Sequence, residues 1–442
     1  MLTRREAVIA VLVAGSAMVV VATRRLTAGP LSPPAGPVAS TYKTLTEVEP
    51  RTVLSAATTP GSSFAVYRIT QPGSYYLAGN VTVPAGVLWG VSIESPRVTL
   101  DLNGFTIDAA GIGGGVSVGN QAGVTVRNGT ITDSVFSGVS CGVVPVGSPG
   151  MMVENIRVVN VLTDTVTVGA LGNVSGISLG RESSAVNCTV VNAPVGITTG
   201  YGSRVVGCTV NAARSIGFDL FDGSIAEGCT ITGTTAQAAN SGMGFYLRNG
   251  TMVTGCAARS NAGAGFVAIT ESTIRGCSSS NNSGGGYVLG NRSMLVDCSA
   301  TQNSGVAIDA GGNCTITNAL VTGGSTGVRL VNGGNRLERS KIGNAVAGVT
   351  SDGIDVIVEN SLNSSGAGVG DGISITGDDT VVDGNAIYGF SRGVASTATF
   401  VSVTRNRFHL ITGVPTFGGG GMVAPTVSTA AGLTNPLANT AQ

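Results

Sequence analysis

Cysteine recurs at a nearly constant spacing through the middle of this 442-residue chain, and this repeat limits the folds open to it. In a typical unit the cysteine follows Asn or Gly and precedes a small residue and an apolar one. The gaps between these cysteines are 20, 21, 27, 21, 21 and 16 residues. A fixed period of this length indicates a solenoid of stacked, equivalent coils. The cysteines that define the repeat are Cys188, Cys208, Cys229, Cys256, Cys277, Cys298 and Cys314.

The same local pattern continues on both sides of the cysteines, with other residues at the cysteine position. Counting these positions gives fourteen units over 301 residues, or about 23 residues per unit. The residues that take the cysteine position are Phe105, Gly129, Ile156, Ser340, Ser361, Asn385 and Asn406.

A second signature lies between these anchors, in the order Gly, apolar, any residue, apolar. Gly217-Phe218-Asp219-Leu220 and Gly244-Phe245-Tyr246-Leu247 are two examples. Alternation with a period of two residues predicts strands with one buried face, and no stretch shows a sustained helical period. The Leu-x-x-Leu-x-Leu pattern of leucine-rich repeats is absent. We therefore predict an all-β fold, a parallel β-helix of about 14 coils with three short strands per coil.

The residue before the cysteine position marks a tight bend. A left-handed backbone conformation costs little for Gly and is tolerable for Asn, which are the residue types found there. The cysteines are expected to point inward and stack as small apolar side chains. Disulfides between adjacent coils are the alternative, because adjacent coils lie within bridging distance.

The two ends of the chain differ in composition from the repeats. Residues 1–28 combine Arg4 and Arg5 with an apolar stretch of 16 residues, which predicts an export signal similar to the twin-arginine type. An ordinary secretory signal and a retained anchor are the alternatives. Residues 29–50 are predicted to be a linker, 51–97 an N-terminal cap, 98–412 the β-helix and 413–442 a C-terminal tail. An exported protein is periplasmic, cell-surface or extracellular, with no stable membrane span after signal removal.

Composition excludes several functional classes. Lys plus Arg equals Asp plus Glu at 24 each, so the chain has no basic field for nucleic acid. A single histidine, His409, argues against multi-histidine metal sites and histidine-based triads. Charged residues make up only 11% of the chain, so any cluster of them deserves scrutiny as a site.

The Gly-apolar-x-apolar runs with Asn or Gly bends resemble right-handed parallel β-helix repeats of the pectate-lyase-like superfamily. The resemblance covers about residues 90–412. It implies that a substrate would lie along one outer sheet, the one built from the Gly-apolar-x-apolar strands. That architecture hosts lyases, hydrolases, epimerases, phage tailspikes and non-enzymes, so the resemblance is specific for the fold and not for the function.

The first candidate site gathers polar residues between two long loops, one after Ile156 and one after Cys229. Carboxylates serve as general acid or base, Arg binds sugar carboxylates, and Tyr offers a stacking face or a phenolic proton. The alternative is a solvated outer face. The predicted catalytic residues are Asp219, Asp222, Tyr246, Arg248 and Glu182, and the predicted substrate-binding residues are Arg181 and Tyr201.

The second candidate site is an acidic cluster near residues 352–383. Asp355 and Asp379 are expected to stack on neighbouring coils, and such paired carboxylates can hold calcium or perform acid–base hydrolysis. The alternative is that these residues form turns. Gly377-Asp378-Asp379 is similar to the paired Asp of polygalacturonases, but the Gly-His-Gly and Arg-x-Lys partners of that family are missing. The cofactor is therefore predicted to be none, or calcium.

Three functions remain open from the sequence. The first is an exported protein that binds and cleaves polysaccharide, as a lyase or a glycoside hydrolase. The second is a non-catalytic surface or envelope scaffold that binds glycan or another protein, favoured by a smooth outer face of Thr and Ser after the cysteine positions. The third is a tailspike-like adhesin. A polysaccharide or other glycan is the predicted partner.

Overall fold

The computed structural model describes residues 50–142, 144, 146–163, 174–237, 241–364, 366, 369–412, 416–417, 422–423, 426–427 and 438–441. The chain divides into two units, Met1–Pro50 and Arg51–Gln442, and the second unit is the one considered below. The predicted export signal and nearly all of the predicted linker lie outside the described residues, as does most of the predicted tail. In the described part of the chain, no helix has the length and apolarity needed to cross a membrane.

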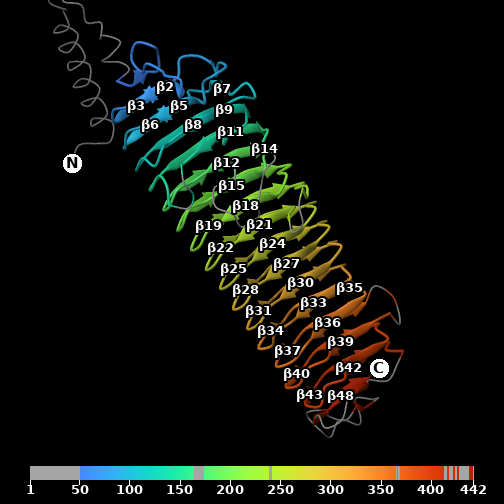
Figure 1. Cartoon of the computed structure of the whole chain (residues 1–442). Helices are drawn as coiled ribbons and strands as arrows, with labels where there is room; N and C mark the ends of the chain where they lie inside the picture. Colours follow the sequence, from blue (N-terminus) through green and yellow to red (C-terminus); the bar gives the residue numbers. More distant parts are fainter. Residues whose placement is uncertain are drawn as a thin grey trace, which may run out of the picture. The chain divides into compact units, whose positions relative to one another are not determined.

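The short strands of the second unit form three rows that run along the stack, and each coil adds to all three. Strands pair in parallel with their equivalents in the next coil (Figure 1). The first row is a sixteen-stranded sheet made of the predicted Gly-apolar-x-apolar strands and their equivalents. Its strands are β2 (Ala65–Ile69), β5 (Trp89–Ile93), β8 (Gly114–Ser117), β10 (Val139–Ser140), β12 (Ser175–Ser178), β15 (Val195–Thr198), β18 (Ile216–Leu220), β21 (Met243–Leu247), β24 (Ala264–Ala268), β27 (Gly285–Leu289), β30 (Val306–Ala310), β33 (Thr326–Leu330), β36 (Ala347–Ser351), β39 (Asp371–Ile375), β42 (Arg392–Ser396) and β45 (Thr416–Phe417).

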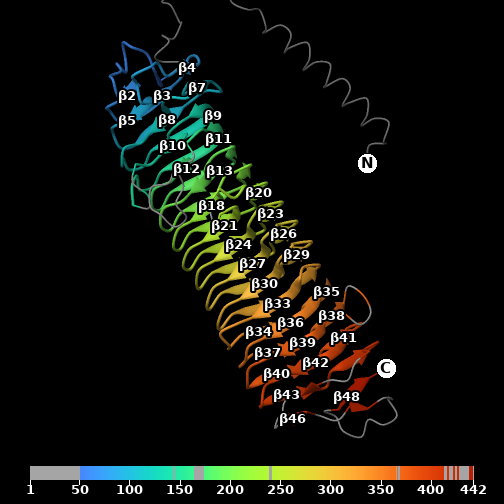
Figure 2. The same cartoon turned by 45° about the vertical axis from the view of Figure 1, so that its right-hand side comes forward.

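The second row precedes the cysteine position and belongs to a thirty-two-stranded sheet (Figure 2). Its strands are β3 (Gly73–Tyr76), β6 (Val98–Asp101), β13 (Ser184–Val186), β16 (Arg204–Val206), β19 (Ile225–Glu227), β22 (Met252–Thr254), β25 (Thr273–Arg275), β28 (Met294–Val296), β31 (Thr315–Thr317), β34 (Arg336–Glu338), β37 (Val356–Val358), β40 (Thr380–Asp383), β43 (Val401–Thr404) and β46 (Met422–Val423). β1 (Thr52–Val53) pairs with β3.

The third row follows the cysteine position in the same sheet, and β9 (Thr125–Ser134) and β11 (Met152–Val161) run through both rows. Its strands are β4 (Val81–Thr82), β7 (Thr106–Asp108), β14 (Thr189–Val191), β17 (Thr209–Asn211), β20 (Thr230–Thr232), β23 (Ala257–Arg259), β26 (Ser278–Ser280), β29 (Ser299–Thr301), β32 (Leu320–Thr322), β35 (Lys341–Ala345), β38 (Ser361–Ser364), β41 (Ala386–Tyr388), β44 (Arg407–His409) and β48 (Asn439–Ala441), with β47 (Thr426–Val427) paired to β48.

The predicted fold class is confirmed, with about sixteen coils where fourteen were expected. The two additional coils lie at opposite ends of the stack: β4 precedes β7 at the N-terminal end, and Asn439 follows Asn406 at the C-terminal end. Within residues 51–97, which we expected to form a cap, β2 pairs in parallel with β5 and β3 pairs in parallel with β6. This segment therefore supplies the first coils of the stack.

The core lies between the rows and consists of inward-pointing side chains stacked on their equivalents. Four rings form one such stack, with centroids 4.6, 4.7 and 5.0 Å apart from Phe218 to Phe245, Phe266 and Tyr287. All four are fully buried. The Tyr287 hydroxyl lies 2.8 Å from the carbonyl oxygen of Cys277, so this polar group is satisfied inside the stack.

Six cysteines, from Cys188 to Cys298, stack in one inward row. The backbone N–H of Cys229 donates to the Sγ of Cys256 at 3.2 Å, and that of Cys256 donates to the Sγ of Cys277 at 3.3 Å. Left-handed bends precede them, as predicted; Gly228, for example, has a φ of 60°.

Cys314, which we expected to be the seventh member of this row, lies at a different position in the coil. Thr315 pairs with Met294 in the second row, so Cys314 stacks on Ser293 at a different bend of the coil. Ala319 takes the position after Cys298, because Leu320 pairs with Ser299. The short gap of 16 residues before Cys314 reflects this change of row. For the same reason of register, Asn360 and not Ser361 occupies the position between Ser340 and Asn385.

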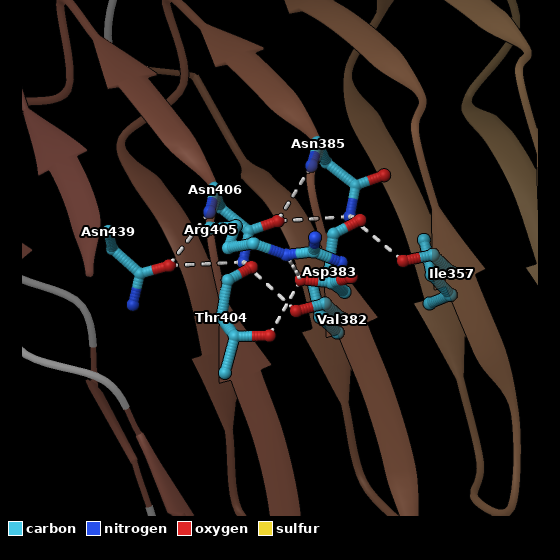
Figure 3. Close-up of polar contacts among 8 residues, drawn as sticks. All are labelled: Ile357, Val382, Asp383, Asn385, Thr404, Arg405, Asn406 and Asn439. Carbon is cyan, nitrogen blue, oxygen red and sulfur yellow. Dashed lines mark hydrogen bonds and ion pairs between the residues drawn. The ribbon is translucent and has the colours of Figure 1, made fainter. Parts of the chain in front are cut away.

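Asparagine replaces cysteine in the last coils of the same row (Figure 3). The Oδ1 of Asn406 accepts from both the backbone N–H and the side-chain amide of Asn385, at 2.9 and 3.0 Å. The Nδ2 of Asn406 in turn donates to the carbonyl oxygen of Val382 at 3.0 Å. Asn360 and Asn439 continue the ladder on either side. Each buried amide is therefore satisfied by its neighbours in the stack.

All eight cysteines are buried free thiols in the structure. Burial raises the pKa of the Cys141 and Cys314 thiols, which suppresses the reactive thiolate. We predict that the native protein reacts slowly with iodoacetamide and that all eight thiols react once it is unfolded without reductant. Intact mass spectrometry before and after reduction checks this. A mass gain on reduction would show that disulfides replace the stacked thiols.

Removing one amide from the asparagine ladder is expected to destabilise the fold. Asn406→Ala leaves the buried N–H of Asn385 without an acceptor, so the free energy of unfolding should fall by about 2–3 kcal/mol. Asn211→Ala is the matched control, because Asn211 is half-buried and its side chain has no hydrogen bond among the described residues. Urea denaturation of both variants measures the difference. Equal stability losses would contradict a special role for the ladder.

Candidate functional site

The outward side chains of the first row form a line that runs from coil to coil. Asp219 on β18 pairs with Tyr246 on β21, which pairs with Val267 on β24. Val288 on β27 and Asp309 on β30 follow. From Asp219 to Asp309, the line therefore has a carboxylate at each end and uncharged side chains between them.

Asp219 and Arg248 form a buried ion pair at one end of this line. The Nε and Nη2 of Arg248 each donate to a different carboxylate oxygen of Asp219, both at 3.2 Å. Asp219 is only 1% exposed. Burial raises the pKa of the Asp219 carboxyl, and the charge of Arg248 acts in the opposite direction. Asp219 thus holds Arg248 in place and is not accessible to a bound molecule.

The Arg248 guanidinium lies over two aromatic rings. Its central carbon lies 3.6 Å from the centroid of Phe221 and 5.7 Å from that of Tyr246. These are distances at which a cation is attracted to a ring. The exposed ring of Tyr201 packs edge-on against Phe221, with centroids 5.9 Å apart. The structure thus brings the predicted residues Asp219, Tyr246 and Arg248 together and adds Phe221, which the sequence analysis did not include.

Three other predicted residues lie on the adjacent turns. Asp222 accepts hydrogen bonds from the backbone and the side chain of Asn249, at 3.1 and 3.4 Å. Arg181 and Glu182 are exposed one coil before Tyr201, and the backbone N–H of Glu182 donates to the carbonyl oxygen of Tyr201. The side chains of Arg181 and Glu182 have no ion pair among the described residues. They border the cluster without joining it.

A groove of about 640 Å³ lies on the outer face of β21, β24 and β27. Tyr246 is its one aromatic residue and Ser241 supplies a hydroxyl. The Asp219–Arg248 pair lies beyond β21, and the Asp309–Arg329 pair, with an Nε–Oδ1 distance of 2.7 Å, lies beyond β27. The lining residues are Ser241, Met243, Tyr246, Gly263, Ala264, Val267, Gly284 and Val288.

The sequence analysis missed most of this groove. Its signal was present as apolar residues at outward positions, such as Val267 and Val288, which occupy the same place in their strands as Asp219. The described end of the long segment between β20 and β21 lies beside the groove, since Ser241 lines it. There the backbone N–H of Gly242 donates to the carbonyl oxygen of Ser215 at 2.6 Å. The groove thus lies next to one of the two long loops that the sequence singled out.

The predicted stacking of Asp355 on Asp379 is wrong. Val356 pairs with Val381, so Asp355 lies across from Thr380. Asp355 is fully buried and accepts hydrogen bonds from Ser351 and Asn335, whereas Asp379 is exposed on a turn with a φ of 60°. No group of three or more His, Cys, Asp or Glu side chains placed to hold a metal occurs among the described residues.

Breaking the Asp219–Arg248 ion pair is expected to destabilise the folded protein. Asp219→Ala leaves a largely buried guanidinium without its partner and should lower the free energy of unfolding by about 3–5 kcal/mol. Asp309→Ala breaks a similar cross-coil pair whose arginine side chain is 49% exposed, and it should cost at most about 1 kcal/mol. Urea denaturation compares the two. Equal losses would show that the burial of Asp219 does not matter.

A comparison with protein families agrees with this architecture. Residues 175–312 match the family model of the right-handed beta helix region. A search of curated proteins finds no match.

Among solved structures, the chain is similar to the tailspike protein of E. coli bacteriophage HK620 in complex with a hexasaccharide. That similarity has 12% identity and a TM-score of 0.38, and it covers 85% of this chain and 66% of the tailspike chain. It is also similar to PfbA, a surface adhesin of Streptococcus pneumoniae, with 13% identity, 82% and 83% of the two chains covered and a TM-score of 0.28. The periplasmic alginate epimerase AlgG shares 12% identity, with 84% and 81% covered and a TM-score of 0.27.

The family match lies in the coils with the most regular repeat. The parallel rows of strands extend the same architecture over the described residues on both sides of that match. The described part of the chain is therefore a parallel β-helix, and its coils over residues 175–312 match the right-handed beta helix region.

Proposed function

We propose that this protein binds an extended, uncharged glycan in the groove on the outer face of β21, β24 and β27. The observation that carries the proposal is the Tyr246 ring beside an apolar floor that includes Met243 and Val267. Hexose rings have an apolar face of C–H groups that packs on such surfaces, and their hydroxyls need polar partners. The phenol of Tyr246 supplies one such partner.

The geometry of the stack favours a linear ligand. The groove runs along the coil axis, and equivalent positions recur about every 4.8 Å along that axis. This repeat is close to the length of one hexose unit in an extended chain, so successive units would meet successive coils. The uncharged stretch ends at the Asp219–Arg248 ion pair on one side and at the Asp309–Arg329 ion pair on the other.

The proposed activity is binding without cleavage. Acid–base hydrolysis of a glycosidic bond needs two titratable groups that reach the bond. Asp219 is buried, and both of its carboxylate oxygens accept hydrogen bonds from Arg248. Asp222 accepts a hydrogen bond from the backbone of Asn249 on the turn. We assign Asp219 and Arg248 the role of positioning Tyr246 and Phe221. An exported protein, as residues 1–28 predict, would meet such glycans in the envelope or outside the cell.

Truncation of Tyr246 tests the proposal. A panel of immobilised neutral glycans would first identify a ligand, and titration calorimetry would then give its affinity. Tyr246→Ala should weaken binding roughly tenfold through loss of the stacking surface. Tyr246→Phe keeps the ring and should lose less. Tyr201→Ala is the control, because Tyr201 is an exposed aromatic residue outside the groove.

Two results would overturn the proposal. One is unchanged affinity in Tyr246→Ala. The other is the appearance of shortened glycan products during incubation with the wild-type protein, detected by chromatography, which would show that the protein cleaves its ligand.

A further inference from the structure

A second groove, of about 490 Å³, lies on the outer face of the third row near the C-terminal end of the stack. It crosses β35, β38, β41 and β44 and so belongs to a different face of the coil from the groove at Tyr246. Neither candidate site from the sequence included it. Its lining residues are Lys341, Ser361, Leu362, Asn363, Ala386, Ile387, Tyr388, Arg407 and His409.

Two exposed cations stand at opposite ends of this groove. Lys341, Ser361, Ala386 and Arg407 occupy equivalent positions on the four successive strands. Three coil steps therefore separate the backbones of Lys341 and Arg407, or about 14 Å along the stack. The small side chains of Ser361 and Ala386 leave the floor between the cations open.

These cations lack the partners that most arginines of the described chain have. Twelve arginines form ion pairs within the described residues, and Lys341 and Arg407 form none there. Arg405, close to Arg407 in sequence, is paired with Asp383. The groove lining contains no carboxylate. The groove therefore has an uncompensated positive charge that favours an anionic ligand.

On the same third-row strands, Asn363, Tyr388 and His409 line the groove with groups that can form hydrogen bonds to hydroxyls. Tyr388 and His409 stack on one another, with ring centroids 5.0 Å apart and an angle of 24° between the planes. This spacing leaves no room for a further ring between them, so a nucleobase cannot insert there. Tyr388 is 41% exposed, and its phenol, the imidazole and the amide of Asn363 line the groove as hydrogen-bonding groups.

We propose that this third-row groove binds an acidic oligosaccharide, with Lys341 and Arg407 contacting carboxylates of two separate sugar units. The amide and ring groups of Asn363, Tyr388 and His409 contact the hydroxyls between them. A chain of uronic acids has a carboxylate on every unit, so it can place two of them at the spacing of the two cations. This second site is independent of the neutral-glycan site proposed above.

The test uses the full-length protein and titration calorimetry with two probes, hexameric oligogalacturonate and hexameric oligoguluronate. We expect one of them to bind, with an affinity that falls as salt is added. Arg407→Gln and Lys341→Gln should each weaken that binding about tenfold, because each removes a charged hydrogen-bond donor. Arg259→Gln is the matched control: Arg259 is exposed on the third row, several coils away, without an ion pair among the described residues.

Four outcomes would overturn the proposal: no binding of either uronate, undiminished binding in the Lys341→Gln, Arg407→Gln double variant, an equal loss in Arg259→Gln, or equally tight binding of a hexathymidylate. The last outcome would identify a general anion site. Circular dichroism of each variant confirms that it is folded. Tyr246→Ala should leave uronate binding unchanged, and the double variant should leave neutral-glycan binding unchanged, so the two proposals can fail separately.

Discussion

The structure depends on the hydrogen bonds that join each coil to the next. The backbone N–H of Thr209, for example, donates to the carbonyl oxygen of Cys188 one coil earlier, at 2.9 Å. Such bonds fix the coil spacing at about 4.8 Å, and every side chain must then fit directly against its equivalent. Rings stack on rings, thiols on thiols and amides on amides. A buried asparagine such as Asn406 is stable in this setting because its neighbours are asparagines that complete its hydrogen bonds.

The same constraint has the opposite effect on the outer faces, where like charges on successive coils would repel. Charged residues of the first row therefore occur as cross-coil pairs, Asp309 with Arg329 and Asp371 with Arg392. The Tyr246 groove lies on the uncharged stretch between the Asp219–Arg248 pair and the Asp309–Arg329 pair. In the third row, Lys341 and Arg407 have no such cross-coil partner among the described residues, and the small residues Ser361 and Ala386 lie between them. The two proposed sites thus differ from these paired charges: the first has uncharged outward side chains, and the second has cations without ion-pair partners among the described residues.

Sequence alone singled out Tyr246 but not the groove that it lines. Asp219, Tyr246 and Arg248 stood out because charge is rare in this chain, and they do lie together. Their roles depend on burial, which the strand pattern does not reveal: Asp219 points outward and is still buried, because Arg248 covers it. The predicted stacking of Asp355 on Asp379 is wrong because the register differs by one residue from the expected one. Thr380, and not Asp379, lies across from Asp355.

The sequence by itself determined the repeat, the bends and the inward row, because each follows from local chemistry. Glycine and asparagine mark the left-handed bends, and alternation marks the buried face of each strand. Only the tertiary structure decided which coil each residue joins and which side chains meet across coils. The unit length varies along the chain, so the register of one coil on the next is set by the fit of whole coils. Cys314 illustrates this: its local sequence matches the cysteine repeat, yet the pairing of Thr315 with Met294 places it on a different bend.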